Sequence, residues 1–324
     1  MNYISNEEKE RKIDKSVVSI SLGSSKRDHK AYAELLGKKF KIERIGTDGD
    51  IKKAIELLKQ MDGKVNAFGL GGIDLCLWAG EKKYLIRDAL KLKNAVSNTP
   101  VVDGSGIKNT LERDVVGVLN QAGIQLKGKK VLMTSAVDRF GLAEALYNAG
   151  CKMLFGDFIF GLGIPIPIRK MKTLKMIAKL LLPILTKLPF KLLYPIGSEQ
   201  EKPSIKKYEK YYLNADIIAG DFHFIKKYMP DNLAGKMIIT NTITLDDINE
   251  LKRRNLDILV TVTPEFSGRY FGTNVIDAII VSLIEKPIEE ITHDDYRDML
   301  SKLKFSPKIN YLHAKRDGRK NTSN

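Results

Sequence analysis

Cysteine and tryptophan are scarce in this chain of 324 residues, which contains two cysteines and one tryptophan. Cys76 and Cys151 both lie in apolar runs, so the sequence predicts two buried free thiols in a reducing compartment rather than a disulfide framework. The sequence shows no zinc-binding spacing either, and we therefore expect no metal site.

Long uncharged apolar runs are also missing, because no such run reaches the ~20 residues that a membrane-spanning helix needs. Residues 1–15 carry too many charges for a secretory signal. These two absences predict a cytoplasmic protein. We expect residues 1–15 to form a disordered arm and residues 313–324 to form a disordered basic tail.

Acidic residues are outnumbered, since 54 Lys and Arg against 39 Asp and Glu give 54 − 39 = +15. This charge predicts an anionic partner, such as a phosphorylated or carboxylate ligand, nucleic acid or an anionic membrane surface. The sequence shows no strand that combines aromatic and basic residues as RNA-binding modules do. We therefore expect a small anionic substrate and no nucleic acid, with a membrane surface as the less favoured alternative.

Length and patterning predict an α/β protein with two domains. We expect an N-terminal α/β substrate-type domain, a connecting helix, a Rossmann-like nucleotide-binding domain with a doubly wound parallel sheet, and a C-terminal helix. Their predicted ranges are 16–106, 107–127, 128–285 and 286–312. The predicted parallel strands of the second sheet are Lys130–Ser135, Met153–Asp157, Ala215–Gly220, Met237–Thr240 and Ile258–Val262.

The stretch from Leu126 to Asp157 shows the pattern of a strand, a turn, a helix and a second strand, which typically opens a dinucleotide-binding domain. A dinucleotide-binding turn carries glycines where the backbone meets the pyrophosphate and where the helix packs on the strand. In this chain the three positions hold Ala136, Asp138 and Gly141. Only the glycine that packs the helix is present.

Two acidic residues decide how this turn is interpreted. Asp138 places a carboxylate where phosphates would bind, which repels them unless Arg139 compensates; the alternative is that Asp138 caps the helix. Asp157 ends the second strand, where an acid would bind a ribose hydroxyl and favour NAD over NADP. The alternative for Asp157 is a solvated strand end.

The segment KNTLERDVVGVLNQAGIQLKGKKVLM, residues 108–133, resembles the connecting helix and first nucleotide-binding strand of shikimate and quinate dehydrogenases. The match lies at Asn109-Thr110 and at Gly123–Lys129, whereas Leu111 replaces the acid that the family pairs with its catalytic lysine. We expect a divergent bacterial member of this quinate dehydrogenase-like group. The resemblance implies an NAD(P)-dependent oxidoreductase that acts on a small hydroxy acid in the interdomain cleft.

The same resemblance suggests where the substrate binds. Asn109 and Thr110 belong to the matching segment, and Ser24-Ser25 is a loose counterpart of the family's serine pair for the substrate carboxylate. Hydride transfer from an alcohol needs a group that accepts the hydroxyl proton. With the family's acid missing, the candidates for this catalytic role are Lys108, Asp103 and His223.

In an open parallel sheet, ligands bind beyond the carboxyl ends of the strands. Polar residues follow the predicted strands at this edge, and we expect them to converge on one crevice: Ser135, Asp157, Asp221, His223, Asn241, Thr242, Thr263 and Glu265. The predicted cofactor-binding residues are Ser135, Ala136, Asp138, Arg139, Gly141, Asp157, Asn241 and Thr263.

A basic segment, Phe158–Ile196, contains no acidic residue and lies within a predicted helical insertion over residues 158–212. Pro183 and Pro189 should break it into short helices. We favour a helical cap whose apolar face packs on the sheet. The alternatives are a channel for an apolar substrate or a surface that lies on an anionic membrane. For the whole chain, the alternatives to an oxidoreductase are a non-redox protein that binds another anionic ligand and a peripheral membrane protein.

Overall fold

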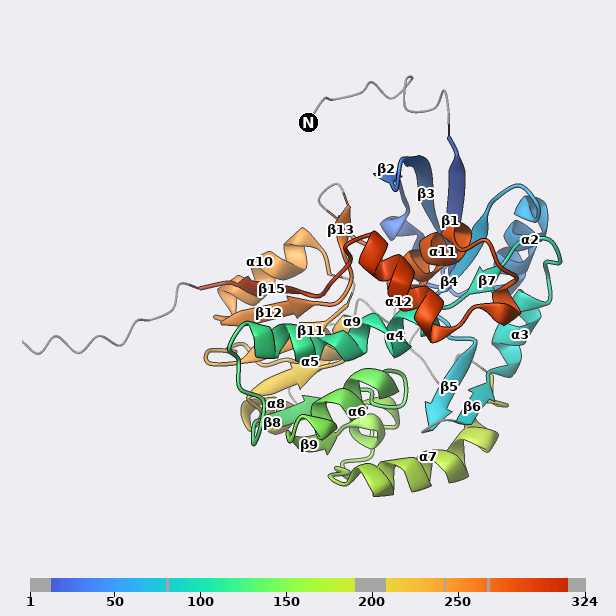
Figure 1. Ribbon diagram of the computed structural model, residues 1–324. Helices are drawn as coiled ribbons and strands as arrows, with labels where there is room; N and C mark the ends of the chain where they lie inside the picture. The colour runs from blue at the N-terminus through green and yellow to red at the C-terminus, as the bar shows by residue number, and fades with distance from the viewer. Residues whose placement is uncertain (1–12, 80–81, 190–207, 242, 267–268, 314–324) are drawn as a thin grey trace, which may run out of the picture.

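The computed structural model describes residues 13–79, 82–189, 208–241, 243–266 and 269–313. It contains two open, largely parallel sheets, one built from the N-terminal part of the chain and one from the C-terminal part (Figure 1). The chain is therefore a mixed α/β protein, as the sequence predicts. The predictions for residues 1–12, 190–207 and 314–324 lie outside the described residues.

The first sheet has the strand order β2-β3-β1-β4-β7. Strand β1 is parallel to β3 and β4, β7 is parallel to β4, and β2 is antiparallel to β3. The strands are β1 (Lys15–Ser21), β2 (His29–Leu35), β3 (Lys38–Gly46), β4 (Ala67–Gly71) and β7 (Val101–Val102). Strand β1 begins inside the range 1–15 that the sequence assigns to an arm.

Helices from both ends of the chain cover this first sheet. Val18 of β1 packs with α2 (Ile51–Met61) and α3 (Arg87–Lys93) on one face. Val17, on the opposite face, packs with α11 (Thr273–Leu283) and α12 (His293–Lys302). The chain therefore returns to its first sheet after completing most of the second.

The second sheet has the strand order β15-β12-β11-β10-β8-β9. Its strands are β8 (Lys130–Met133), β9 (Lys152–Phe155), β10 (Ile217–Ala219), β11 (Met237–Thr240), β12 (Ile258–Thr261) and β15 (Lys308–Tyr311). The prediction of five parallel strands is confirmed, because β8 to β12 all pair in parallel. Strand β15, which the sequence did not indicate, adds an antiparallel edge.

Alternating side chains show that helices cover both faces of the second sheet. Val131 and Met133 pack with α5 (Leu111–Gln121) and α6 (Phe140–Asn148). Leu132 packs on the other face with helices α8, α9 and α10, which span Glu209–Leu213, Phe222–Tyr228 and Leu245–Arg253.

The connecting helix predicted from residue 107 is interrupted. Helix α4 (Ser105–Asn109) ends at Thr110, whose φ and ψ of −119° and −83° leave the helical region, and α5 then begins. The hydroxyl of Thr110 donates to the carbonyl oxygen of Gly106 at 2.6 Å, a local bond that competes with helix continuation. Because of this break, α4 and α5 do not form one continuous helix, and Lys108 lies on the short helix α4.

The predicted break at Pro183 is wrong, since α7 (Met171–Leu185) runs through it as one helix. Pro183 lies in the last turn and is exposed, as is Lys179, whose carbonyl loses its helical partner to the proline ring. Helix α7 spans the two halves of the molecule: Leu174 packs with the second sheet, and Leu182 packs with the first sheet's core. Figure 1 shows α7 beside the hairpin of β5 (Cys76–Ala79) and β6 (Lys82–Leu85).

Cys76 and Cys151 are free and buried, as predicted. Thr292 and Asp295 form a capping box at the start of α12. Within the described residues, no helix is long and apolar enough to cross a membrane.

Candidate active site between the two sheets

The carboxyl ends of the two sheets face each other. Asp74 follows β4 of the first sheet and Asp138 follows β8 of the second, and both contact the amine of Lys108. Arg27 follows β1 and bonds to His223, which follows β10. The polar residues at the carboxyl edge of the second sheet therefore contact residues that follow strands of the first sheet.

Lys108 is the centre of the contacts between the sheets and is only 8% exposed. Its Nζ donates to Asp74 Oδ1 at 2.7 Å and to Asp138 Oδ1 at 2.5 Å. Burial acts to lower the pKa of Lys108, but the charge of Asp138, with a smaller contribution from Asp74, outweighs burial and holds this pKa above its usual value. Lys108 is therefore a fixed positive charge.

The two carboxyl groups that share Lys108 have opposite ionisation preferences. Burial raises the pKa of Asp74 well above its usual range, and the nearby Asp138 adds to this effect. Burial would also raise the pKa of Asp138, but Lys108 and Arg139 together hold it well below its usual range. The pair is thus stable as a protonated Asp74 beside an ionised Asp138.

Arg139 extends the charged network into the core of the second half. It is 2% exposed, and its Nη1 donates to a carboxylate oxygen of the fully buried Glu112. Its Nη2 donates to Asp221 Oδ2 at 3.4 Å, and its Nε lies 3.7 Å from Asp138 Oδ2. Arg139 therefore joins carboxylates from α5, the turn after β8 and the end of β10.

His223 connects this network to the first sheet. Its Nε2 lies 2.9 Å from Arg27 Nη1, so the neutral ring accepts a hydrogen bond from the guanidinium. Burial lowers the pKa of His223, and Arg27 adds to this effect against the opposing charge of Asp221. Asn241 donates to Asp221 Oδ2 at 3.3 Å. We call Lys108, Asp74, Asp138, Arg139, Glu112, Asp221, His223 and Arg27 the cleft cluster.

Asp103, predicted as a catalytic candidate, holds the loops around the cleft cluster. Its carboxylate accepts from the backbone nitrogen of Leu75 at 2.6 Å and from that of Ser105 at 3.0 Å. Asp277 of α11 supports α4 from the other side by accepting from Gly104 N at 2.9 Å. These bonds position the start of α4, and through it Lys108.

The structure shows where the two acidic residues of the turn after β8 lie. Asp138 is not the cap of α6, because Arg139 is the N-cap residue and gives no side-chain cap bond. Asp157, instead of ending in solvent, turns back and accepts from Val137 N at 2.9 Å. Ala136 lies in the core, and a side chain at Gly141 would collide with the carbonyl oxygen of Lys108, so this glycine packs α6 against α4.

A cavity of about 130 Å³ adjoins this turn. Its polar lining residues, which we call the floor, are Thr134, Ser135, Asp138 and Asp157, and its apolar lining, which we call the walls, includes Leu77, Phe158, Ile177 and Leu181. Among the described residues, Ser135 Oγ and Asp157 Oδ2 are buried without a hydrogen-bond partner. Burial raises the pKa of Asp157 to about 6, against the opposing bond from Val137. A cavity with apolar walls, a few convergent polar groups and a shifted pKa has the features of a ligand site.

The predicted substrate residues have local partners. Ser24 is buried, and its hydroxyl accepts from Lys26 N at 3.3 Å, while Ser25 N donates to Asp48 at 2.8 Å. Thr110 bonds within its own helix, and Asn109 is half-buried beside it.

The remaining sequence candidates lie after β11 and β12. Thr263 is fully buried after β12, and its hydroxyl has no hydrogen-bond partner among the described residues, whereas Asn241 bonds to Asp221 of the cleft cluster. Thr242 and the side chain of Glu265 lie outside what the structure describes. Across the described residues, no three His, Cys, Asp or Glu side chains are grouped as metal ligands.

Sequence reasoning placed Lys108, Asp138, Arg139 and His223 at the site but did not find three of their partners. Arg27 and Glu112 received no role, and Asp74 was not among the predicted site residues. The sequence gives only weak signals for them: Arg27 follows a strand, and Glu112 lies four residues after Lys108. Partners separated by tens of residues are identified only by the fold.

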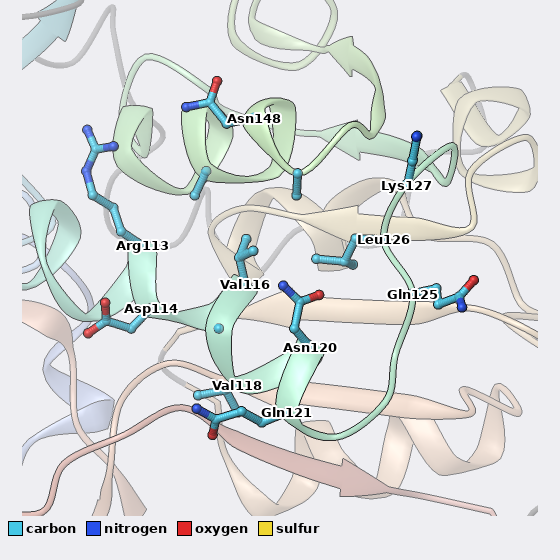
Figure 2. Close-up of a pocket in the computed structure, with 13 residues that line it drawn as sticks. Arg113, Asp114, Val116, Val118, Asn120, Gln121, Gln125, Leu126, Lys127 and Asn148 are labelled. Carbon is cyan, nitrogen blue, oxygen red and sulfur yellow. The ribbon is translucent and has the colours of Figure 1, made fainter.

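A larger open groove of about 930 Å³ lies elsewhere, between α5, α6 and the loop that leads to β8 (Figure 2). Arg113 and Asp114 lie at one end, and Gln125 and Lys127 lie at the other. None of the cleft cluster lines this groove. The cleft is therefore the better candidate for chemistry.

Two family models match the chain. Residues 106–312 match a domain of unknown function, DUF8754, and residues 16–103 match another, DUF8753. No curated protein sequence matches. The predicted membership of the shikimate and quinate dehydrogenase family is wrong, because these two models are the families that match.

Solved structures show only weak similarity. A galactofuranose binding protein is 15% identical, and the match covers 89% of this chain and 98% of that one with a TM-score of 0.35. GanP, a glucose-galactose binding protein from Geobacillus stearothermophilus, is 11% identical, with 93% and 98% covered and a TM-score of 0.36. The NAD-dependent malic enzyme from Thermotoga maritima is 12% identical, with 90% and 84% covered and a TM-score of 0.34. These TM-scores carry no argument about ligand or activity.

Proposed function

The chain belongs to the DUF8754 family, and we propose that it binds a small molecule in the cavity beside the cleft cluster and moves a proton on it. The observation that carries this proposal is the pair Asp138 and Asp157, which line one cavity with opposite ionisation preferences. Two carboxyl groups whose surroundings separate their pKa values are the usual basis of acid and base roles.

Asp157 is the proton-transfer group in this proposal. A general base works best when its pKa lies near the working pH, and burial raises the pKa of Asp157 to about 6. Its Oδ1 is fixed by Val137 N, so the Oδ2 atom is the one that can meet a ligand. The neighbouring hydroxyl of Ser135 can donate to the ligand or accept from it.

Asp138 and Lys108 have a different role. Lys108 and Arg139 keep Asp138 ionised, so Asp138 offers a fixed negative charge and a hydrogen-bond acceptor at the cavity floor. Lys108 does not line the cavity, and it acts as a positioning residue through Asp138. The floor therefore favours a ligand group that donates hydrogen bonds, such as a hydroxyl or an amine.

The cavity walls define the rest of the ligand. Its volume of about 130 Å³ is below the ~300 Å³ at which drug-sized pockets begin. The cavity receives apolar surface from Leu77, Ile177 and Leu181. We infer a small molecule with an apolar body and a hydroxyl or amine head.

Oxidation of such a hydroxyl with NAD, or with NADP, stays a prediction from the sequence. Two features weigh against ordinary pyrophosphate binding at the turn after β8. Asp157 already accepts the backbone N–H of Val137, a group of the kind that phosphates use, and the Asp138 carboxylate lies beside it. The measurement is thermal stabilisation by NAD, NADP and their reduced forms, because a ligand specific for the native state raises the melting temperature.

The proposed site is tested by a melting-temperature screen with small alcohols, hydroxy acids, amines and sugars. We expect at least one compound to stabilise the protein, more strongly at pH 7 than at pH 5, because ionised Asp157 accepts the ligand's hydrogen bond. Asp157→Asn should remove this pH dependence. The matched control is Asp246→Asn on the exposed start of α10, which should preserve it. Stabilisation that Asp157→Asn leaves unchanged, or no stabilising compound, would contradict the proposal.

A further inference from the structure

Exposed apolar side chains are concentrated on one short part of the chain. The structure has twelve large hydrophobic residues that are well exposed among those described, and six of them lie between residues 162 and 184. They are Leu162 (44% exposed), Ile164 (42%), Ile166 (55%), Met176 (57%), Leu180 (66%) and Ile184 (62%). We call these six the α7 platform, because they lie on α7 and on the loop before it.

Helix α7 has two apolar faces. The first, with Met171, Leu174 and Ala178, is buried against the two sheets. The second consists of Met176, Leu180 and Ile184, which are spaced by four residues and therefore share one side of the helix. A surface helix of a globular protein needs only the first of these faces. The second face is not explained by the fold.

The charged residues of the segment that carries the α7 platform are all basic. No acidic residue occurs between Phe158 and Pro189, whereas Arg169, Lys170, Lys172 and Lys179 are exposed. Lys172 and Lys179 lie seven residues apart, so they project together along one edge of the second apolar face. Lys175 pairs with Glu144 of α6 at 2.8 Å. An apolar face edged by lysines is the pattern of a helix that lies in a membrane interface.

We propose that the α7 platform docks onto the surface of an anionic lipid bilayer. Helix α7 lies at the outer margin of the molecule, with the sheets on its other side (Figure 1). Met176, Leu180 and Ile184 enter the boundary between headgroups and acyl chains, together with Ile164 and Ile166. The lysines at the edge contact lipid phosphates. Charge complementarity selects the lipid, because every exposed charge between residues 158 and 189 is positive.

A lipid surface fits this face better than a protein partner. A protein groove would offer acidic residues to only some of the cations, whereas a bilayer offers anionic headgroups along the whole helix. Since no described helix can cross a membrane, α7 lies on the bilayer without spanning it. This docking does not depend on the ligand proposed for the cavity.

The test is co-sedimentation of the full chain with phosphatidylcholine vesicles that contain phosphatidylglycerol, and with vesicles of phosphatidylcholine alone. We expect binding to the anionic vesicles, weakened by added salt, and at least about tenfold weaker partitioning into the neutral ones. Lys172→Glu with Lys179→Glu should reduce binding to the anionic vesicles by at least about tenfold. The control is Lys52→Glu with Lys59→Glu, which makes the same change at the same spacing on exposed positions of α2.

A second pair of variants tests the apolar face. Leu180→Gln with Ile184→Gln should reduce vesicle binding, whereas Leu213→Gln with Leu245→Gln, which alters leucines exposed elsewhere, should preserve it. All four residues are exposed, so melting temperatures should stay close to that of the unaltered chain. Equal binding to neutral and anionic vesicles would overturn the proposal. A platform variant that binds the vesicles as well as the unaltered chain does would also overturn it. The same holds if the unaltered chain binds no lipid and instead self-associates through this face, and Leu180→Gln abolishes that self-association.

Discussion

The cleft cluster and the ion pairs on α9 and α10 show two different uses of charge. On the surface, Lys226 bonds to Asp247 at 2.7 Å and to Glu250 at 3.0 Å, and its side chain is 44% exposed. In the cleft, Lys108 bonds to Asp74 and Asp138 at similar distances, but its side chain is 10% exposed. The geometry is alike and the surroundings differ, so burial decides what each group of charges does.

Burial makes the cleft cluster costly. Buried charges lose their hydration, and this loss is offset only when each charge has its full set of partners. Apolar residues of the same shape would often give the folded protein the same or greater stability. Ion pairs on the surface keep most of their hydration, and they contribute little to the free energy of unfolding. A buried cluster at the carboxyl ends of two sheets is therefore better explained by chemistry than by stability.

The largest expected effect is at Arg139. Replacing it in Arg139→Met leaves the fully buried Glu112 without its cation, and should reduce the free energy of unfolding by about 3–5 kcal/mol. Denaturant titration measures this loss. The double variant Arg139→Met with Glu112→Leu should recover part of the stability, because the fully buried carboxylate of Glu112 is then removed together with its cation. If Arg139→Met is as stable as the unaltered chain, then burial does not distinguish the charges of the cleft cluster from those on the surface.

The second largest expected effect is a pH dependence of the free energy of unfolding, caused by Asp277, which bonds to the start of α4. Burial raises the pKa of Asp277 to about 7, although Tyr296 donates to it at 2.5 Å. In the unfolded chain an aspartate has a pKa of about 3.9, so the native state binds the proton more tightly. The stabilisation is complete below pH ~4 and is lost as pH rises towards 7.

Asp277→Asn should flatten this part of the stability profile, which urea titrations between pH 4 and 8 would measure. The exposed Asp298→Asn is the control. A profile that falls equally steeply in Asp277→Asn would show that another group titrates.

The smallest effect is expected on the surface. Lys226→Ala should change the free energy of unfolding by no more than about 1 kcal/mol, since exposed ion pairs contribute ~0–1 kcal/mol. Added salt should reduce the difference further. A loss as large as that of Arg139→Met would mean that exposure does not separate the two groups of charges.

The fold was more predictable than its ligand. Apolar runs such as Met237–Thr240 are buried on both sides, and this pattern identifies parallel strands. The short edge strand β15 has half-buried and exposed residues and gives no such signal. The sequence also did not predict that α11 packs on the first sheet. Hydrophobic periodicity shows that a helix has a buried face, but it does not show which sheet that face packs against.

The candidate site was predictable in its residue types and not in its pairings. The sequence predicts different roles for Lys108 and Asp138, as a catalytic residue and a phosphate-site residue, but the two bond to each other. A contact of Asp157 with a ribose stays a prediction; in the structure its carboxylate accepts from Val137 N in the turn after β8. Backbone geometry in that turn, which the sequence pattern does not specify, decides where the Asp157 carboxylate points.

The central claim is that Asp157 titrates near neutral pH in a cavity whose other carboxylate, Asp138, stays ionised. Carbon-13 NMR of labelled aspartate carboxyl groups measures this directly across pH 3 to 8. We predict one resonance with a pKa of about 6 that is absent in Asp157→Asn. A stabilising small molecule should shift the same resonance. An Asp157 carboxyl that titrates at the ordinary value of about 4 would contradict the account.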